Sequence, residues 1–183
     1  MVRLRNKRKK AETDDPAPSV PPTPKEVRQS TFERAIKLLA AKSRSVAELR
    51  QLLTQGRGTN NAAVEDVLAR LREYGYLNDE RFAFGYASLK VLQRPLGRHR
   101  LKRDLMMKKV DKAVVDEALD LVFAEVSEEE LIDRAIEKRT RVRGRPKNRT
   151  QAKSLFDHLM RQGFPYELVA EKVRAASETD LEE

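Results

Sequence analysis

The chain contains no cysteine and no tryptophan, and only 5% of its 183 residues are aromatic. Without cysteine there is no disulfide framework, no cysteine-based zinc site and no cysteine nucleophile. Apolar residues make up 39%, which is low for a compact globule. No apolar run approaches the roughly 18 residues of a membrane span, and the basic N-terminus lacks the apolar segment of a secretory signal. These absences predict small aliphatic cores within short helices, and a protein of the cytoplasm that does not bind membranes.

Positive charge dominates the chain and is unevenly distributed. The formal net charge is +9. Residues 88–112 contain nine basic and two acidic residues, and residues 134–153 contain nine basic and one acidic residue. An acidic block at 125–133 separates the two basic segments. This pattern predicts polyanions or acidic protein surfaces as partners.

The two ends of the chain are predicted to be disordered tails. Residues 1–29 join the basic run RLRNKRKK to the proline-rich run DDPAPSVPPTP, and neither can bury a core. The basic run is typical of a nuclear signal or a nucleic-acid arm, but a solvated tail with weak affinity for anions is the favoured interpretation. Residues 178–183 form a short acidic tail.

The rest of the chain has the apolar periodicity of short helices. Phe32, Ala35, Ile36 and Leu39 follow the i, i+3, i+4, i+7 spacing of one helix face. Further along, serine and glutamate three residues apart form predicted capping boxes, at Ser45 with Glu48 and at Ser127 with Glu130. No stretch alternates convincingly between apolar and polar residues, so no strand is predicted.

A repeated pattern divides these helices into three groups. The segments LLTQG, LMMKKV and LMRQGF, which begin at Leu52, Leu105 and Leu159, each end a predicted helix. Helices this short are unstable alone, so neighbouring repeats must bury their apolar faces together. The second repeat starts with Asn78 or Asp79 as its N-cap. We therefore predict an all-α, elongated and curved array of three tandem three-helix repeats, at residues 30–78, 79–126 and 127–177.

Three segments together form a specific pattern: SVAELRQLL, VLARLREYGYLNDERFAFGY and GRHRLKRDLMMKKV, which begin at Ser45, Val67 and Gly97. They resemble the RecX family, the regulatory proteins of the RecA recombinase. The resemblance covers about residues 31–175. It implies a crescent-like all-α monomer that lies in the groove of the RecA–single-stranded-DNA filament. Such a protein would limit filament extension, ATPase activity and strand exchange without a catalytic centre or cofactor. Lys109 stands where the family usually has glycine, which predicts a less sharply turned helix end.

Two basic segments are the candidate partner-binding sites. The first surrounds Gly97, and the second surrounds an Arg-Gly-Arg-Pro sequence similar to an AT-hook, for which a basic loop between helices is the better interpretation. For the first segment a solvated helix face is the alternative, but its excess charge favours contact with phosphates or with carboxylates of a protein. For the second segment such a contact stays open. The candidate residues are Arg94, Arg98, Arg100, Lys102, Arg103, Lys108, Lys109, Arg141, Arg143, Arg145, Lys147 and Arg149.

Five of the ten Tyr and Phe residues lie in the segment EYGYLNDERFAFGY, residues 73–86. A base-stacking platform would interleave such rings with basic side chains, but here the neighbours are mainly acidic or amide residues. We therefore predict a role in the core and at the junction between repeats, with Phe84 as the ring most open to solvent. The predicted junction residues are Tyr76, Leu77, Asp79 and Phe82.

No pattern predicts catalysis or a bound metal. His99 and His158 fall in different repeats, and the chain has neither a phosphate-binding glycine loop nor metal-ligand spacing. We expect no enzymatic activity and no cofactor. Two functions remain open. One is a regulator of RecA that binds the RecA filament and, weakly, single-stranded or duplex DNA; the other is a stand-alone, architectural DNA-binding protein of helix-turn-helix-like units.

Overall fold

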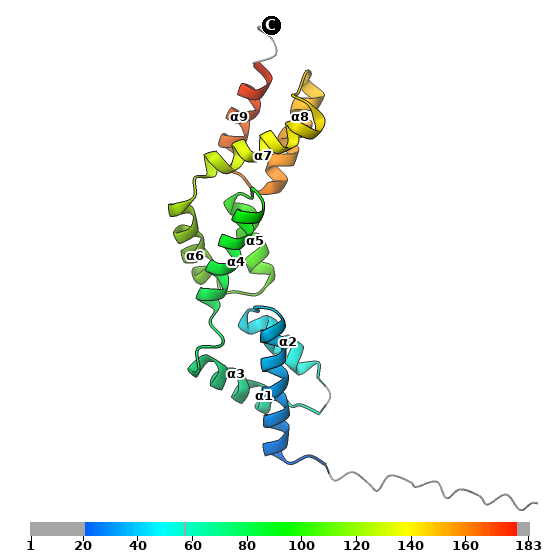
Figure 1. The fold of residues 1–183 in the computed structure, drawn as a ribbon, viewed down its shortest axis with the longest axis vertical. Helices are drawn as coiled ribbons and strands as arrows, with labels where there is room; N and C mark the ends of the chain where they lie inside the picture. Colours follow the sequence, from blue (N-terminus) through cyan, green and yellow to red (C-terminus); the bar gives the residue numbers. More distant parts are fainter. Residues whose placement is uncertain (1–20, 57, 179–183) are drawn as a thin grey trace, which may run out of the picture.

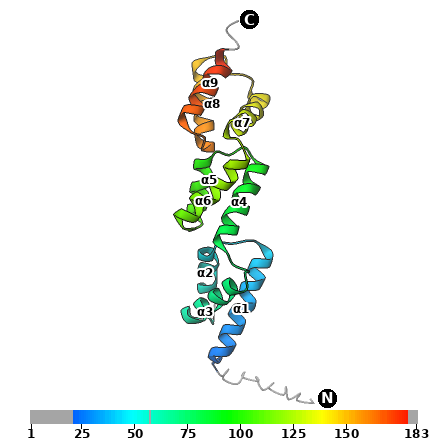
Figure 2. The same cartoon turned by 90° about the vertical axis from the view of Figure 1, so that its left-hand side faces the viewer.

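A computed structural model describes residues 21–56 and 58–178, and within these residues it contains nine helices and no strand. The helices stack along one long axis, with α1 near one end and α8 and α9 near the other (Figures 1 and 2). This confirms the predicted elongated all-α fold. The helices are α1 Pro24–Ala41, α2 Val46–Thr54, α3 Asn61–Glu73, α4 Asp79–Gln93, α5 Arg98–Met107, α6 Lys112–Glu125, α7 Glu128–Arg143, α8 Arg149–Gln162 and α9 Tyr166–Glu178.

Helices that follow one another along the chain pack in groups of three. We call α1–α3 unit 1, α4–α6 unit 2 and α7–α9 unit 3, since the three helices of each group contact one another. Most helices begin at a polar residue whose side chain accepts a hydrogen bond from the first turn, which satisfies a backbone N–H that has no partner inside the helix. These N-caps are Thr23, Ser45, Asn60, Asn78, Asp111, Ser127 and Asn148.

Helix α1 begins at Pro24, so the predicted boundary of a disordered tail at residue 29 is wrong. Thr23 and Glu26 form a capping box, and Pro24 occupies the first turn. Proline is favourable there because its missing N–H would have no partner in the helix anyway. Pro24, one of the prolines on which the predicted tail was based, therefore belongs to the first turn of a helix. The predicted tail residues 1–20 and 179–183 lie outside the described residues.

Three helices end in the same tight turn, in which the backbone becomes left-handed at the C-cap or at the residue after it. Gly75 ends α3 in this way, Lys109 ends α5 and Gly163 ends α8, with φ of 69°, 57° and 87°. After α5, the N–H of Val110 donates to the carbonyl of Leu105. The expectation of a less sharp turn at Lys109 is therefore wrong, because lysine adopts the conformation that glycine adopts in the other two turns.

The turn at Gly75 also explains where the aromatic segment departs from prediction. The N–H groups of Tyr76 and Leu77 both donate to the carbonyl of Leu71. This reversal directs Leu77 into the core, where it is 3% exposed, and leaves Tyr76 61% exposed. Phe82 is buried as predicted. Tyr76 lies at the junction of units 1 and 2, but it packs edge-on against Tyr74 on the surface instead of in the core.

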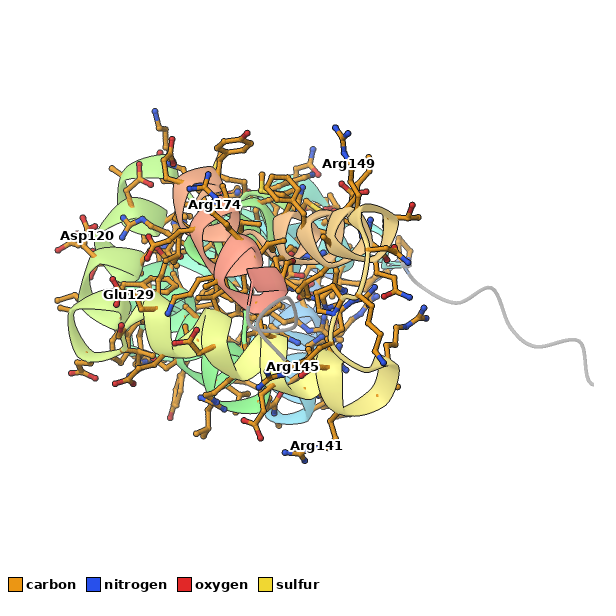
Figure 3. The ribbon with its side chains drawn as sticks, turned by 90° about the horizontal axis from the view of Figure 1, so that it is seen from above. Asp120, Glu129, Arg141, Arg145, Arg149 and Arg174 are labelled. Carbon is orange, nitrogen blue, oxygen red and sulfur yellow. The ribbon has the colours of Figure 1, made fainter. Side chains whose placement is uncertain are left out.

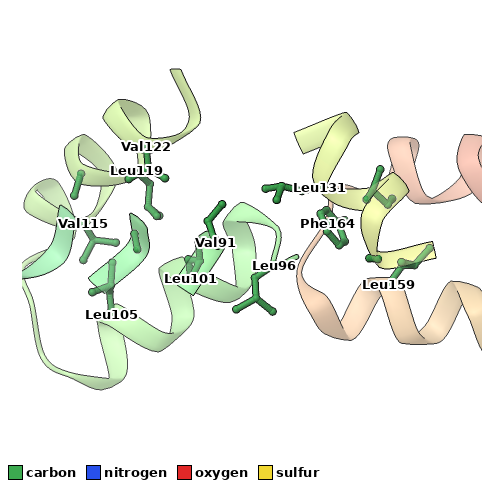
Figure 4. Close-up of a cluster of buried hydrophobic side chains, with 14 of the residues drawn as sticks. Val91, Leu96, Leu101, Leu105, Val115, Leu119, Val122, Leu131, Leu159 and Phe164 are labelled. Carbon is green, nitrogen blue, oxygen red and sulfur yellow. The ribbon is translucent and has the colours of Figure 1, made fainter. Parts of the chain in front are cut away.

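Buried apolar side chains form two separate clusters. One lies within unit 1 and includes Leu49, Leu53 and Leu77. The other is shared by units 2 and 3 and includes Leu105 and Phe164, the latter 1% exposed (Figure 4). Units 2 and 3 therefore share one core, whereas unit 1 keeps its own.

The joint between units 2 and 3 is formed by two glycines whose backbones touch. The N–H of Gly97 donates to the carbonyl of Gln162 at 3.0 Å, and the N–H of His99 donates to that of Gly163 at 3.1 Å. A Cβ added to Gly97 would lie 2.3 Å from the Gly163 oxygen. The Glu128 carboxylate at the start of α7 accepts from the N–H of Arg98 at 2.8 Å.

The joint between units 1 and 2 uses side chains at the corresponding positions. Ser45, the N-cap of α2, donates its hydroxyl to the carbonyl of Lys108 at 2.6 Å. Asp79, the first residue of α4, accepts from the N–H of Val46 at 2.8 Å. The Lys108 ammonium donates to the Glu48 carboxylate at 2.8 Å. Of the two N-caps considered for α4, Asn78 caps α4 itself, and Asp79 instead caps the preceding unit.

Candidate functional site

Three of the predicted partner-binding cations form ion pairs within the fold, and one of these pairs joins two units. Arg98 pairs with Asp120 at 2.5 Å and Lys102 with Asp116 at 2.5 Å, and both pairs tie α5 to α6. Lys108 pairs with Glu48 and lies over the rings of Phe82 and Tyr86. Because their charges are matched within the fold, these side chains are poor candidates for contact with a partner, contrary to the expectation from sequence.

The other predicted cations of unit 2 face solvent. Arg103 and Lys109 are exposed on α5 and the turn that follows it, and Arg94 is exposed at the end of α4. Arg100 donates to the Asp104 carboxylate at 3.0 Å, one helical turn further along α5, and stays partly exposed. The exposed residues keep the role that the sequence predicts for them as candidate contacts.

The second basic segment forms the connection between α7 and α8. Gly144 has a φ of 76°, Pro146 is buried, and the N–H of Lys147 donates to the Gln151 side chain at 2.7 Å. The Arg-Gly-Arg-Pro sequence is thus folded against its own unit, which favours the basic loop over an extended AT-hook. Its candidate residues Arg141, Arg143, Arg145, Lys147 and Arg149 are all exposed.

Exposed arginines surround the connection between α7 and α8. Seen along the long axis, Asp120 and Glu129 lie at the left edge, whereas Arg149 lies at the upper right, Arg141 at the lower edge and Arg145 nearer the centre (Figure 3). Arg141 is the least available of these arginines, because it pairs with Glu137 at 2.6 Å. The arginines give this part of unit 3 a positive field.

A concave basic surface lies where α4, α5, α7 and α8 meet, and we call it the junction groove. Its volume is about 560 Å³, and its apolar lining includes the buried Leu96 and Ala135 and the exposed Val142. Asp104 is its one carboxylate, and this group already accepts a hydrogen bond from Arg100. The basic residues that line it are Lys90, Arg94, Arg100, Lys138, Arg139 and Arg143.

Burial, together with the crowding of positive charge, lowers the pKa of two groups in the junction groove. Burial lowers the pKa of His158, and the nearby charges of Arg139, Arg161 and Arg143 lower it further. Burial also lowers the pKa of Arg139, together with Arg143 and Arg161. The Arg139 guanidinium donates to the Ser154 hydroxyl at 2.9 Å, so it is held in place without a carboxylate. The groove is consequently electropositive, because its one carboxylate does not balance the charge of its basic side chains.

Sequence reasoning identified part of this groove and missed the rest. Arg94, Arg100 and Arg143 were predicted, whereas Lys90, Lys138, Arg139 and His158 were not. The spacing of Arg139 and Arg143, one helical turn apart, does indicate a basic face on α7. The facing residues on α4 and α8 are brought to it only by the packing of units 2 and 3.

The described residues show no other site of evident chemistry. They contain no group of three or more histidine and carboxylate side chains able to hold a metal ion. None of the helices described is long and apolar enough to cross a membrane. Phe84 is 37% exposed, but Tyr74 at 53% and Tyr76 at 61% are more open to solvent, so the prediction that Phe84 is the most open ring is wrong. Phe84 borders a shallow depression with Val114 and Leu121.

Comparison with known proteins assigns the family. The family model for the second three-helix domain of RecX matches residues 78–119. The regulatory protein RecX of Streptomyces coelicolor is 30% identical over 148 residues, which cover 81% of this chain and 78% of that protein. The chain belongs to the RecX family. The match to the second domain falls on unit 2, which contributes one side of the junction groove.

Other RecX proteins extend the likeness. The RecX of Treponema pallidum is 38% identical over 104 residues, covering 57% of this chain and 63% of that protein. The chain spans about half the length of the RecX proteins of Bacillus licheniformis and Lactococcus lactis, 56% and 50% respectively. The crystal structure of RecX from Lactobacillus salivarius shares the fold, with a TM-score of 0.72, 17% identity, and coverage of 83% of this chain and 97% of that one.

Proposed function

We propose that the chain is a regulator, mainly an inhibitor, of the RecA recombinase. It binds in the groove of the RecA–single-stranded-DNA filament and limits filament extension, ATPase activity and strand exchange. We expect such a regulator to act in the cytoplasm, as a monomer without enzymatic activity. Membership of the RecX family supports the role, and the positively charged junction groove of an elongated stack is the observation that carries the mode of binding.

The arrangement suits an extended and negatively charged partner. Units 2 and 3 share one core, so the basic groove between them is held as one surface. A positive surface attracts phosphates and carboxylates over distances of about 10 Å at ordinary salt, and arginine can bind both types of group with two parallel hydrogen bonds. We expect the exposed arginines to make these contacts, while Arg98, Lys102 and Lys108 maintain the shape of the stack.

The test is a titration of the full chain onto preformed RecA–single-stranded-DNA filaments. The proposal predicts binding and a fall in ATPase activity and strand exchange as the protein approaches saturation. If both activities stayed unchanged at an excess of protein over filament, the proposed regulation would be excluded.

A matched pair of variants tests the surface. The double variant Arg94→Glu, Arg143→Glu reverses two exposed charges of the junction groove, and we expect at least tenfold weaker filament binding. Arg174→Glu makes the same kind of change at an exposed position of α9, outside the groove, and should bind nearly as well as the parent. Equal binding by all three proteins would show that the contact lies elsewhere.

The alternative, a stand-alone DNA-binding protein, is favoured by the same positive surface. Binding to bare duplex DNA would release counterions, and the logarithm of affinity would fall with the logarithm of salt by about 0.9 for each phosphate contacted. Tight, sequence-selective duplex binding without RecA would support this alternative. Weak and unselective binding agrees with the RecA-directed function.

A further inference from the structure

The junction groove has more positive charge than the fold itself can use. Six basic side chains line it against the single carboxylate of Asp104, and that carboxylate is taken by Arg100. In the described residues, no carboxylate lies within ion-pairing distance of Arg94, Lys138 or Arg143. Like charges brought together in this way repel one another, and a bound anion would relieve the repulsion.

We propose that the junction groove is a binding site for an oligophosphate, a ligand with two or more adjacent phosphate groups. Nothing about the site requires RecA, so the proposal goes beyond the regulatory function and can hold without it. A nucleoside triphosphate and a single strand of nucleic acid both offer this chemistry.

The number and placement of the cations favour adjacent phosphates over a single carboxylate. Arg94 is the C-cap of α4, Arg100 comes from α5, and Lys138, Arg139 and Arg143 come from α7, so the positive groups line the groove from three helices. One carboxylate would meet only one or two of them. A chain of phosphates carries several charges and many acceptor oxygens, which match planar guanidinium groups in pairs.

The volume and apolar lining of the groove fit the rest of such a ligand. A volume of about 560 Å³ lies within the range of roughly 300–1,000 Å³ of small-ligand sites. Leu96, Ala135 and Val142 add apolar lining that a sugar or base can contact. The volume thus suits a nucleotide or a short piece of a single strand.

His158 supplies a direct reporter of the occupied groove. It lines the groove, and burial and neighbouring arginines lower its pKa. A bound polyanion would cancel part of the arginine charge, so the imidazolium would become more favourable and the pKa would rise. The chain has only one other histidine, the exposed His99, which does not line the groove. The His158 signal therefore reports on the groove, and the His99 signal of the same sample is its control.

The experiment follows both imidazole signals by NMR during pH titrations of the full chain with inorganic tripolyphosphate, ATP or a short oligo-dT, alongside calorimetry. We expect the pKa of His158 to rise by at least half a unit and the His99 signal to change little. Response to tripolyphosphate and ATP identifies recognition of the phosphates alone. Response only to oligo-dT identifies a nucleic-acid strand as the source, and either result supports the proposal.

Variants decide whether the response comes from the groove. Lys138→Ala with Arg143→Ala should weaken binding at least tenfold and abolish the rise in the His158 pKa, while Arg174→Ala should change neither. Circular dichroism checks that each variant stays helical. The proposal is overturned if no probe moves His158, or if the groove variant binds as well as Arg174→Ala. RecA is absent throughout, so a negative result here leaves inhibition of RecA to be judged by its own assay.

Discussion

Units 1 and 2 are joined through side chains, whereas units 2 and 3 are joined through the backbone at the same positions. In the first joint the N-cap is Ser45 and the left-handed residue is Lys109; in the second these are Gly97 and Gly163. Each joint keeps an acidic cap from the next unit, Asp79 or Glu128. The same contact between repeats therefore occurs in two forms. With side chains at these positions units 1 and 2 keep separate cores, and with two glycines units 2 and 3 approach closely and share one core.

The closed joint explains why its left-handed residue is glycine and the other is not. A Cβ on Gly163 would lie 2.2 Å from the backbone nitrogen of Arg100. Lys109 is exposed, so the joint between units 1 and 2 leaves room for a side chain at this position. Only the conformational cost of a left-handed lysine remains, about 1–2 kcal/mol.

The largest effect is expected from closing the space between the two glycines. Gly163→Ala adds the left-handed penalty of about 1–2 kcal/mol to overpacking of about 1–3 kcal/mol, so we expect a loss of about 2–5 kcal/mol. Urea unfolding measures the loss, and hydrogen exchange should locate it in units 2 and 3 with α1–α3 still protected.

Gly75→Ala is the matched control for this change. Gly75 also has a positive φ, but a Cβ there would meet nothing within 4 Å. It should cost only the conformational term of about 1–2 kcal/mol. Equal losses from the two substitutions would mean that the contact between units 2 and 3 contributes nothing beyond its backbone conformation.

A smaller effect is expected from loosening the joint between units 1 and 2. Glu48→Gln removes the ion pair with Lys108, which we expect to cost on the order of 1 kcal/mol and to widen the distribution of distances between spin labels on units 1 and 2. Labels on units 2 and 3 should report no change. Asp133→Asn breaks the Lys172 ion pair inside unit 3 and serves as the control.

The same joint should respond to acid. Burial raises the pKa of Glu48, but hydrogen bonds from Lys108 and the Ser45 N–H, with the charges of Lys108 and Lys42, outweigh it and place the pKa below its ordinary value. The stabilisation is therefore complete above the ordinary carboxyl pKa of about 4.3 and is lost as the pH falls through the lowered value. Distances between units 1 and 2 that widen on acidification in the parent, but not in Glu48→Gln, would agree with this; the same response in both would contradict it.

The smallest effect is expected at Lys109. Lys109→Gly removes a left-handed penalty of about 1–2 kcal/mol and adds backbone entropy to the unfolded chain, worth about 0.5–1 kcal/mol. We expect a net gain between about 0 and 1.5 kcal/mol, seen as a higher urea midpoint with an unchanged slope. Lys109→Ala keeps the Cβ and should not stabilise. A gain of the same size in both variants would point to the lysine charge as the cause.

Local patterns predicted the helices better than the contacts between them. Apolar spacing and the Ser45–Glu48 box identified helices that the structure contains, because these signals act within one or two turns. The start of α1 was missed because Pro24 marks a helix start and a disordered segment equally well. The partners of Arg98, Lys102 and Lys108 lie in other helices or another unit, so the charge pattern alone could not tell an internal tie from an exposed contact.

The contact between Gly97 and Gly163 consists of main-chain atoms. The orientation of units 2 and 3 and the charge of the junction groove therefore depend on different atoms. Arg100 and Gln162 adjoin it and line the junction groove, yet the joint itself depends on no charged side chain for its hydrogen bonds to Gln162 and Gly163. We therefore expect substitutions of the charges around the groove to leave the relative orientation of units 2 and 3 unchanged, because the hydrogen bonds at the two glycines do not involve those side chains.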